Sequence, residues 1–269
     1  MAIITISRGS YSMGKCVAEK VAKRLQYDLI SRDILLAASE RFNVPEIKLE
    51  KAIHNAPSIL ERYGHGKQTY IAYIRSALVN RVINNNIVYH GLAGHFLLKG
   101  ITHILKVRIT SNIENRVKNE IKQKNISESQ AREMILEDDM QRRKWTKSLY
   151  GEDPWDSSLY DLTICIDKLS IENAVDFICK ATESDAFQTT EKSIQKMKDL
   201  ALACHIKAAL IDDFPDVGIT CEYGNLLVYL KSKDYGNKLL KRIKQLQNDI
   251  EGVYSLEIHS GIIIPPEAV

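Results

Sequence analysis

The chain has 269 residues, of which 45% are hydrophobic and 26% charged, and its formal net charge is +3. This composition is typical of a soluble globular protein, and the length allows one main domain and a second small one. The small positive charge suits an anionic ligand and does not indicate nucleic acid as a partner. No apolar run approaches the length of a membrane span, and no segment resembles a signal peptide. The five cysteines lack a CxxC spacing, which favours reduced thiols in a cytoplasmic protein.

The first predicted elements are a strand over residues 3–8, a loop bounded by two glycines, and an amphipathic helix that begins near Lys15. The loop fits the pattern GxxxxGK[ST] except at its last position. Glycines allow backbone N–H groups to turn inward around phosphate oxygens, and the helix N-terminus adds partial positive charge. The pattern therefore predicts a phosphate-binding loop, with Lys15 on the outer phosphates; the alternative is a plain strand–helix turn. The loop consists of Gly9, Ser10, Tyr11, Ser12, Met13, Gly14, Lys15 and Cys16.

Cys16 stands where this pattern has the hydroxyl that binds Mg²⁺. A thiol is a soft ligand and a poor substitute for an oxygen on a hard cation. The sequence therefore leaves two interpretations open. Either Mg²⁺ is held through water, Ser10, Ser12 or Asp33, or metal-assisted catalysis is weakened.

A short second strand is expected over residues 27–30, and Asp33 follows its carboxyl end. Ligands bind at this edge of an open α/β sheet, so Asp33 is a candidate ligand; it could also cap the following helix. Residues 43–86 are expected to be helical, with a break at residues 63–66, and to form a mobile flap over a substrate. Buried strands are predicted over 87–91 and 104–109, which gives the βαβ rhythm of a parallel sheet.

Two further helices are predicted after Asn112 and after Ser127, where Ser127 and Gln130 form a capping-box pair. The second helix carries two acids followed by a basic cluster that includes Arg142 and Arg143. Such a cluster fits a lid that closes arginines over transferring phosphates, or a solvated face with i,i+4 ion pairs. A last strand over 160–167 and a helix over 171–178 complete the unit.

Four segments in this order resemble the cytidylate kinase-like family of P-loop nucleoside monophosphate kinases. They are ITISRGSYSMGKCVAEKVAKRL, SRDILLAA, DDMQRRKW and SLYDLTICIDKLSIENAVDFI. The resemblance covers residues 1–182 and implies a five-stranded parallel sheet with flanking helices, a flap at about 40–86 and a helical lid at about 125–156.

The resemblance also implies roles for individual residues. The loop from Gly9 to Cys16 would hold the phosphates of ATP, and Lys15 would stabilise the transferred group. Asp33 would lie near the acceptor or the metal. Arg142 and Arg143 would close from the lid, and Asp161 would orient a lid arginine or the acceptor ribose. Relatives tend to have Gly-Arg after the third strand, whereas this chain has His90-Gly91-Leu92.

Beyond a polar linker at residues 183–192, the predicted order of elements over residues 193–269 is αββαβ, with a tight hairpin around Tyr223-Gly224-Asn225. This small α+β unit resembles a BON domain, which implies a ligand-sensing or docking module. It leaves open homo-oligomer formation or docking of a partner through this unit.

Two functions follow. The first is an enzyme that transfers a phosphoryl group from ATP, with Mg²⁺, to a CMP-like nucleoside monophosphate or another small phosphorylated acceptor. The alternative is a nucleotide-binding regulator with a weakly active or inactive kinase fold that signals through the BON-like unit. Lys15 and the lid arginines favour the enzyme, and Cys16 and Leu92 favour the regulator.

Overall fold

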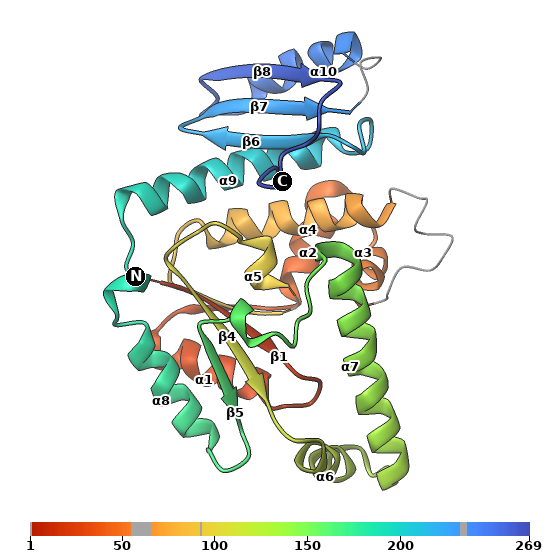
Figure 1. The fold of residues 1–269 in the computed structure, drawn as a ribbon, viewed down its shortest axis with the longest axis vertical. Helices are drawn as coiled ribbons and strands as arrows, with labels where there is room; N and C mark the ends of the chain where they lie inside the picture. Colours follow the sequence, from red (N-terminus) through yellow and green to blue (C-terminus); the bar gives the residue numbers. More distant parts are fainter. Residues whose placement is uncertain (1, 55–65, 92, 232–235) are drawn as a thin grey trace.

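The computed structural model describes residues 2–54, 66–91, 93–231 and 236–269 (Figure 1). Leu92 and most of the expected break at 63–66 lie outside these residues. Within the described residues, the larger sheet has five strands in the order β2-β3-β1-β4-β5, and every neighbouring pair is parallel. This confirms the predicted five-stranded parallel sheet. Its strands are β1 (Ile3–Arg8), β2 (Asp28–Ile30), β3 (Ile87–His90), β4 (Ile104–Thr110) and β5 (Leu162–Cys165).

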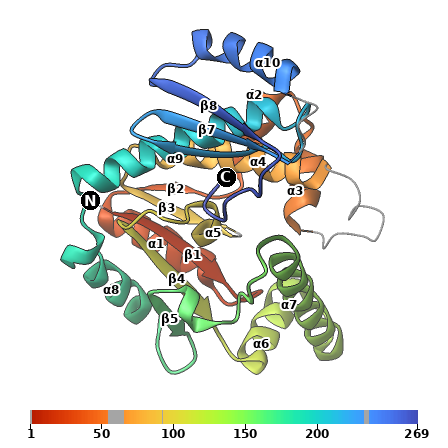
Figure 2. The ribbon, with the colours of Figure 1, turned by 45° about the horizontal axis from the view of Figure 1, so that its top comes forward.

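Helices cover both faces of this sheet because its buried strands present apolar side chains alternately to each side. In β1, Ile4 and Ile6 pack on one face and Ile3 on the other. The first face is covered by α1 (Gly14–Leu25) and α8 (Ile171–Ala181). The opposite face is covered by α2 (Asp33–Phe42), α4 (Gly66–Val82) and α5 (Gly94–Leu97), and α3 (Glu46–His54) packs on α2 and α4 (Figure 2).

Two helices, α6 (Ile113–Lys124) and α7 (Glu128–Tyr150), pair beyond the carboxyl ends of β1 and β4 (Figure 1). The capping box predicted at the start of α7 is present, since Ser127 accepts from the backbone of Gln130 and the Gln130 side chain accepts from the backbone of Ser127. Near its other end, Trp145 is fully buried in the main core. The α7 helix is therefore anchored in the core near its carboxyl end, while the rest of it extends over the edge of the sheet. A short 3-10 turn (Ser157–Leu159) follows it before β5.

The helix α4, within the segment expected to form a flap, is largely part of the core. Ile74, Leu78 and Val79 of α4 are fully buried against α2 and the sheet. Burying a side chain of this size stabilises the folded state by about 1.5–3 kcal/mol. The described part of the segment that can border a substrate is therefore α3 rather than α4.

The C-terminal unit has the predicted αββαβ order. Its sheet has the order β6-β7-β8, with β6 and β7 antiparallel and β7 and β8 parallel. Tyr223 and Gly224, which connect β6 to β7, have φ values of 49° and 76°, as a two-residue type I′ hairpin requires. The elements are α9 (Glu191–Leu210), β6 (Gly218–Glu222), β7 (Asn225–Leu230), α10 (Gly236–Asp249) and β8 (Ser255–Ser260).

The α9 helix packs on both parts of the molecule and lies between α4 and the smaller sheet (Figures 1 and 2). Met197 and Cys204 belong to the core under α4, whereas Ile206 and Leu210 belong to the core of the C-terminal unit. The segment expected to be a linker includes a 3-10 turn (Asp185–Phe187), and its Phe187 packs against the core under α1 and α8. The two parts are therefore joined by packing as well as by the chain.

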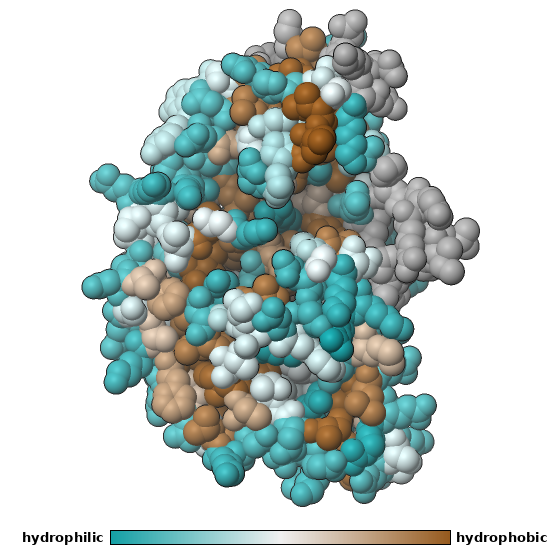
Figure 3. Space-filling model, in the orientation of Figure 1, coloured by the Kyte–Doolittle hydropathy of each residue, from teal (hydrophilic) through white to brown (hydrophobic). Residues whose placement is uncertain are grey.

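The surface is mixed, with apolar side chains between hydrophilic ones and one strongly apolar group at the end of the C-terminal unit (Figure 3). The most exposed large apolar side chain is Ile263, which is 92% exposed, and scattered residues of this kind are normal on a protein surface. In the described part of the chain, no helix combines the length and apolar character needed to span a bilayer.

Candidate active site

The loop between β1 and α1 is fastened to the neighbouring strand β4. Its Gly9 N–H donates to the carbonyl of Ile109 at 3.0 Å, and the Ser12 hydroxyl lies 2.9 Å from the Gly9 carbonyl and 3.0 Å from that of Ile109. Tyr11 and Met13 have left-handed φ values of 59° and 62°. The inward turn of the loop is therefore made at these two residues and not at the glycines.

Gly14 is required for space. A Cβ atom at this position would lie 2.8 Å from the Cβ of Arg8. The first turn of α1 also carries N–H groups suited to phosphate. The first i→i−4 hydrogen bond runs from Val17 N to Met13 O. Met13 is the N-cap residue, and within the described residues its side chain accepts no hydrogen bond from the N–H groups of the first turn. The N–H groups of Gly14, Lys15 and Cys16 therefore precede that bond, as at any helix N-terminus.

A pocket of about 280 Å³ opens beside this loop at the carboxyl ends of β1 and β3, between α2, α3 and α7. Lys15 borders it; this side chain is 74% exposed, and its Nζ lies 3.8 Å from Glu19 Oε1. Arg32 also borders it but is paired with Glu46 and Glu50, at 3.1 Å each. The charged and titratable residues around the pocket are Arg8, Lys15, Arg32, Glu50, Tyr89, His90 and Arg142.

Arg8 and Arg142 are the main electrostatic feature of this pocket. Neither guanidinium lies within ion-pair distance of a carboxylate of the described residues. Burial, and then the charge of Arg142, lower the pKa of Arg8 to about 10, and burial lowers the pKa of Arg142. Asp138 attracts both guanidinium groups, and Asp139 attracts that of Arg142, without forming an ion pair with either. Two half-buried cations without a close ion-pair partner still favour an anion, and a guanidinium matches a phosphate with two parallel donors. The pocket is therefore prepared for an anionic group.

His90, the last residue of β3, lies against this pair. Its Nε2 is buried, and no partner for it is present among residues 2–54, 66–91, 93–231 and 236–269. Burial lowers its pKa to about 3, and the charges of Arg8, Arg142 and Lys15 act in the same direction. The ring is therefore neutral at pH 7 and adds a polar nitrogen to the pocket without adding charge.

A buried ion pair ties α6 and α7 to the loop. Arg116 Nη1 lies 2.7 Å from Asp139 Oδ2 and donates to the Ser10 carbonyl at 3.0 Å, while the Ser10 N–H donates to Asp139 Oδ1 at 3.0 Å. Both charged side chains are 11% exposed. The position of the loop is thus coupled to the helix that carries Arg142.

Arg142 is the lid arginine that reaches the pocket, and Arg143 does not. The Arg143 guanidinium is bound to Asp153 through two nitrogens, and it lies 4.5 Å above the ring of Trp155. Arg143 pulls the pKa of Asp153 far below its usual range, with Lys147 assisting. This side chain fixes the loop that follows α7.

Two of the predicted carboxylates are engaged elsewhere. Asp161, just before β5, accepts from the backbone N–H of Lys106 at 2.8 Å and lies 3.4 Å from Lys106 Nζ. Asp33 begins α2, but its carboxylate turns back to accept the Ser31 N–H at 2.6 Å and lies 3.9 Å from Arg81. Asp33 is therefore next to the pocket without lining it, and Asp161 is held at the β4–β5 pair.

The described residues contain no cluster of three or more His, Cys, Asp or Glu side chains placed to hold a metal ion. Ser12 is buried and its hydroxyl is directed at two carbonyls. Ser10 is buried as well, and its hydroxyl has no hydrogen-bond partner among the described residues. Neither serine that the sequence offered in place of Cys16 is exposed to the pocket. A divalent cation would be held here through phosphate oxygens and water.

The order of the sheet and the glycine-bounded loop between its central strand and α1 define an α/β protein of the P-loop kinase fold. The chain belongs to the cytidylate kinase-like family, whose family model matches residues 3–168. It is similar to the crystal structure of an uncharacterized protein from Eubacterium ventriosum (20% identity, TM-score 0.52, covering 68% of this chain and 99% of that one).

Two kinases are also similar at lower TM-scores. A shikimate kinase from Bacteroides thetaiotaomicron has 12% identity and a TM-score of 0.40 over 68% of this chain and 99% of its own. A gluconokinase from Sinorhizobium meliloti has 14% identity and a TM-score of 0.39 over 70% of this chain and 98% of its own. No curated protein matches the chain.

Proposed function

We propose that the protein is a phosphotransferase that moves the γ-phosphoryl group of ATP to a small acceptor that carries an anionic group of its own, with nucleoside monophosphates such as CMP as the first class. Membership of a kinase-like family supports phosphoryl transfer in general. The observation that carries the proposal is the unpaired Arg8–Arg142 couple in the pocket beside Lys15. A cytoplasmic location, where ATP and such acceptors occur, is part of the proposal.

In this proposal the loop from Gly9 to Cys16 holds the triphosphate mainly through the N–H groups at the start of α1, since those of Gly9 and Ser10 already donate within the protein. Lys15 extends along the outer phosphates. Arg8 and Arg142 face the transferring group and the phosphate of the acceptor. Phosphoryl transfer breaks the bond between the γ-phosphorus and the β–γ bridging oxygen as an acceptor oxygen bonds to that phosphorus. Its transition state is helped mainly by alignment and by neutralising charge. These cations supply both, and Mg²⁺, when bound to the phosphates, would add to the neutralisation.

The remaining predicted site residues act in this proposal through other groups. Arg143 positions the loop after α7 through Asp153, and Asp161 positions the edge of β5 through Lys106. Asp33 orders the turn into α2, which carries pocket residues Ile34 and Leu35.

The second candidate function is nucleotide binding with regulation and little turnover. Cys16 supports it, because the described loop offers no outward hydroxyl for Mg²⁺. For the C-terminal unit, residues 193–269, we propose a BON-like regulatory module; the observed αββαβ order supports this. Because α9 packs into the cores of both parts, we propose that the C-terminal unit influences the kinase part through this direct contact and not through a flexible linker.

The deciding experiment is a phosphoryl-transfer screen. Purified full-length protein with ATP and Mg²⁺ is assayed against CMP, dCMP, UMP, AMP and GMP, and ATP binding is measured by calorimetry. Formation of a diphosphate from one acceptor at a rate above about 1 s⁻¹, the lower range for kinases, supports the enzyme. Binding of ATP without transfer to any acceptor supports the regulator.

Replacing Lys15 with alanine is expected to raise the Kd for ATP by about 10- to 150-fold, because loss of a hydrogen bond to a charged group costs about 1.5–3 kcal/mol. Since Lys15 is largely exposed, the fold should be unaffected. Lys23→Ala, an exposed residue on the same helix outside the pocket, is the matched control. Unchanged ATP affinity in Lys15→Ala would contradict the assignment of the phosphate-binding loop.

Replacing Cys16 with serine is expected to raise Mg²⁺-dependent turnover, by about 10- to 100-fold if the hydroxyl joins the coordination of the metal. The measurement is a titration of Mg²⁺ at saturating ATP in both proteins. Identical turnover and identical Mg²⁺ dependence would show that this position has no role toward the metal.

A further inference from the structure

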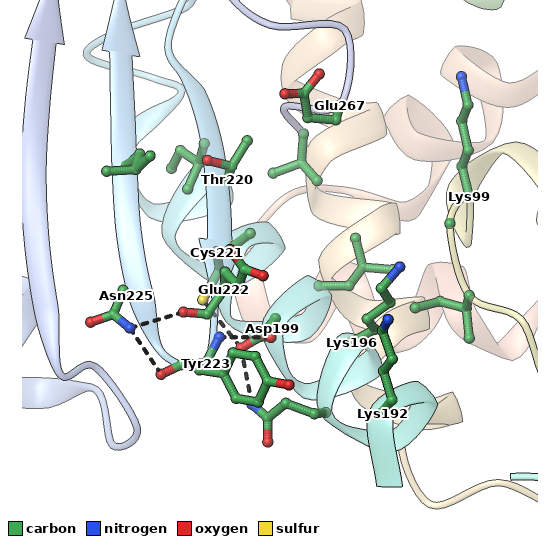
Figure 4. A pocket seen from close by; sticks show the side chains of 18 of the residues that line it. Lys99, Lys192, Lys196, Asp199, Thr220, Cys221, Glu222, Tyr223, Asn225 and Glu267 are labelled. Carbon is green, nitrogen blue, oxygen red and sulfur yellow. Dashed lines mark hydrogen bonds between the residues drawn. The ribbon is translucent and has the colours of Figure 1, made fainter. Parts of the chain in front are cut away.

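A second and larger pocket, of about 470 Å³, lies between α9, the face of β6 and β7, and the segment from Lys99 to Ile101 that precedes β4 (Figure 4). It shares no lining residue with the pocket beside the loop. Its volume lies within the range of about 300–1,000 Å³ of cavities that enclose metabolite-sized ligands. The pocket is therefore large enough for a ligand of its own.

One wall of this pocket is cationic. Lys192 and Lys196 lie one turn apart on α9, whereas Lys99, on the segment before β4, lines the pocket with its ammonium group directed away from the other two (Figure 4). No ion pair joins any of these three lysines to a carboxylate within the part of the chain that the structure describes. Two ammonium groups one turn apart suit a phosphate, for which lysine is a common point-charge partner.

Asp199, the carboxylate of α9 that lines this pocket, is already engaged in hydrogen bonds. It is buried and accepts the N–H groups of Tyr223 and Gly224 at 3.0 Å each, so it holds the β6–β7 turn against α9. The amide of Gln195 also donates to it at 3.1 Å. Asp199 thus shapes the pocket and is engaged by its own hydrogen bonds. Glu222 and Glu267 also line the pocket but form no ion pair with Lys192 or Lys196 in the described part of the chain, so the positive charge lies on the α9 side.

The opposite side suits a planar ring. The Tyr223 side chain is 58% exposed at the rim, where the left-handed turn holds it (Figure 4). Leu200, Ala203 and Leu227 add apolar surface, and Glu222 adds an acceptor for amino or hydroxyl groups. An aromatic side chain next to a basic wall is the arrangement by which proteins bind the base and phosphate of a nucleotide without strong sequence preference.

We infer that this pocket binds a nucleotide, with its phosphate on Lys192 and Lys196 and its base against Tyr223. The site is separate from the catalytic pocket, so the protein would hold a nucleotide at two places. Failure of the proposed kinase activity would leave this inference intact, because it depends on different residues.

The test uses isotope-labelled full-length protein and amide NMR spectra. The probes are AMP, CMP, GMP, UMP and ATP, with inorganic phosphate titrated separately. Lys15→Ala is run in parallel to weaken the loop site. We expect at least one nucleotide to shift the amide resonances of residues 192–203 and 219–229 saturably, in the original protein and in Lys15→Ala alike. The double variant Lys192→Gln/Lys196→Gln should raise the Kd of that shift at least tenfold.

Lys198→Gln is the matched control, because Lys198 is exposed on the same helix but does not line the pocket; its Kd should be unchanged. Lys99→Gln tests the separate segment before β4 and should weaken binding less than the Lys192→Gln/Lys196→Gln variant does. Three results would overturn the inference: no shift with any nucleotide, equal loss in Lys198→Gln, or inorganic phosphate binding as tightly as the nucleotides. The last would show an anion site without recognition of a base.

Discussion

Alanine at position 8 is expected to lower kcat/KM for phosphoryl transfer by about 10²–10³-fold, the loss typical when one preorganised group that stabilises a transition state is removed. Arg8 and Arg142 face one pocket without a carboxylate partner among the described residues, so their charge is available to the reacting phosphates. Arg8→Lys should recover only part of the activity, because an ammonium cannot make the paired contact of a guanidinium. Steady-state kinetics with the acceptor found in the screen measures both variants.

Arg143→Ala is the control for this experiment, since Arg143 is the next residue after Arg142 and is bound to Asp153. Its kcat/KM should stay within about threefold of the original value, because its solvent-screened ion pair lies outside the pocket. Thermal unfolding gives a second, independent readout. Removing Arg8 relieves repulsion from Arg142, so Tm should be unchanged or higher while activity falls. Equal losses in Arg8→Ala and Arg143→Ala, or a lower Tm in Arg8→Ala, would refute this account of the pocket.

The second large effect is expected on stability. Arg116→Ala should lower the free energy of unfolding by about 3–5 kcal/mol, because it leaves the buried carboxylate of Asp139 without its partner. At about 2–4 °C per kcal/mol for a chain of this size, Tm should fall by about 6–20 °C. Urea and thermal unfolding, followed by circular dichroism, provide the measurement.

The same two helices contain the matched control. Arg132 of α7 pairs with Glu114 of α6, as Asp139 of α7 pairs with Arg116 of α6, but the Glu114 side chain is 57% exposed. Arg132→Ala should therefore cost far less stability than Arg116→Ala, because solvent screens an exposed ion pair. If both variants lose the same stability, burial is not what makes the Arg116–Asp139 pair important. Because Asp139 also accepts the Ser10 N–H, Arg116→Ala should weaken ATP binding as well.

The sequence was sufficient for the order of elements, since alternation in the strands, the glycine-bounded loop and the capping box of Ser127 are local signals. The side chains that make the pocket were harder to find. Arg142 and Arg143 are equivalent in a sequence, but adjacent helical residues point about 100° apart, and the position of Asp153 decides which one faces inward. In the sequence, Arg8 is only the last residue of a strand. Its role in the pocket depends on Arg142, which is more than 130 residues away in the chain and comes close only in the folded structure.

The backbone of the loop also departs from expectation for a physical reason. Positive φ is normally assigned to glycine, yet Tyr11 and Met13 adopt it, held by the contacts of the loop with β4 and α7. Long-range hydrogen bonds of this kind leave no local pattern. The α9 helix is a similar case, because a helix buried on two sides has no clear polar stripe from which to read its orientation.

The shared α9 helix sets the order in which this protein can mature on the ribosome. The surface of α4 that Met197 and Cys204 cover is synthesised more than a hundred residues earlier, which at about 5–20 residues per second is a delay of several seconds or more. During that interval the P-loop part exposes an apolar face, and a truncation at residue 190 would expose it permanently. The P-loop part is thus expected to reach its final stability only when the C-terminal unit has been made, which ties the supply of stably folded protein to full-length translation.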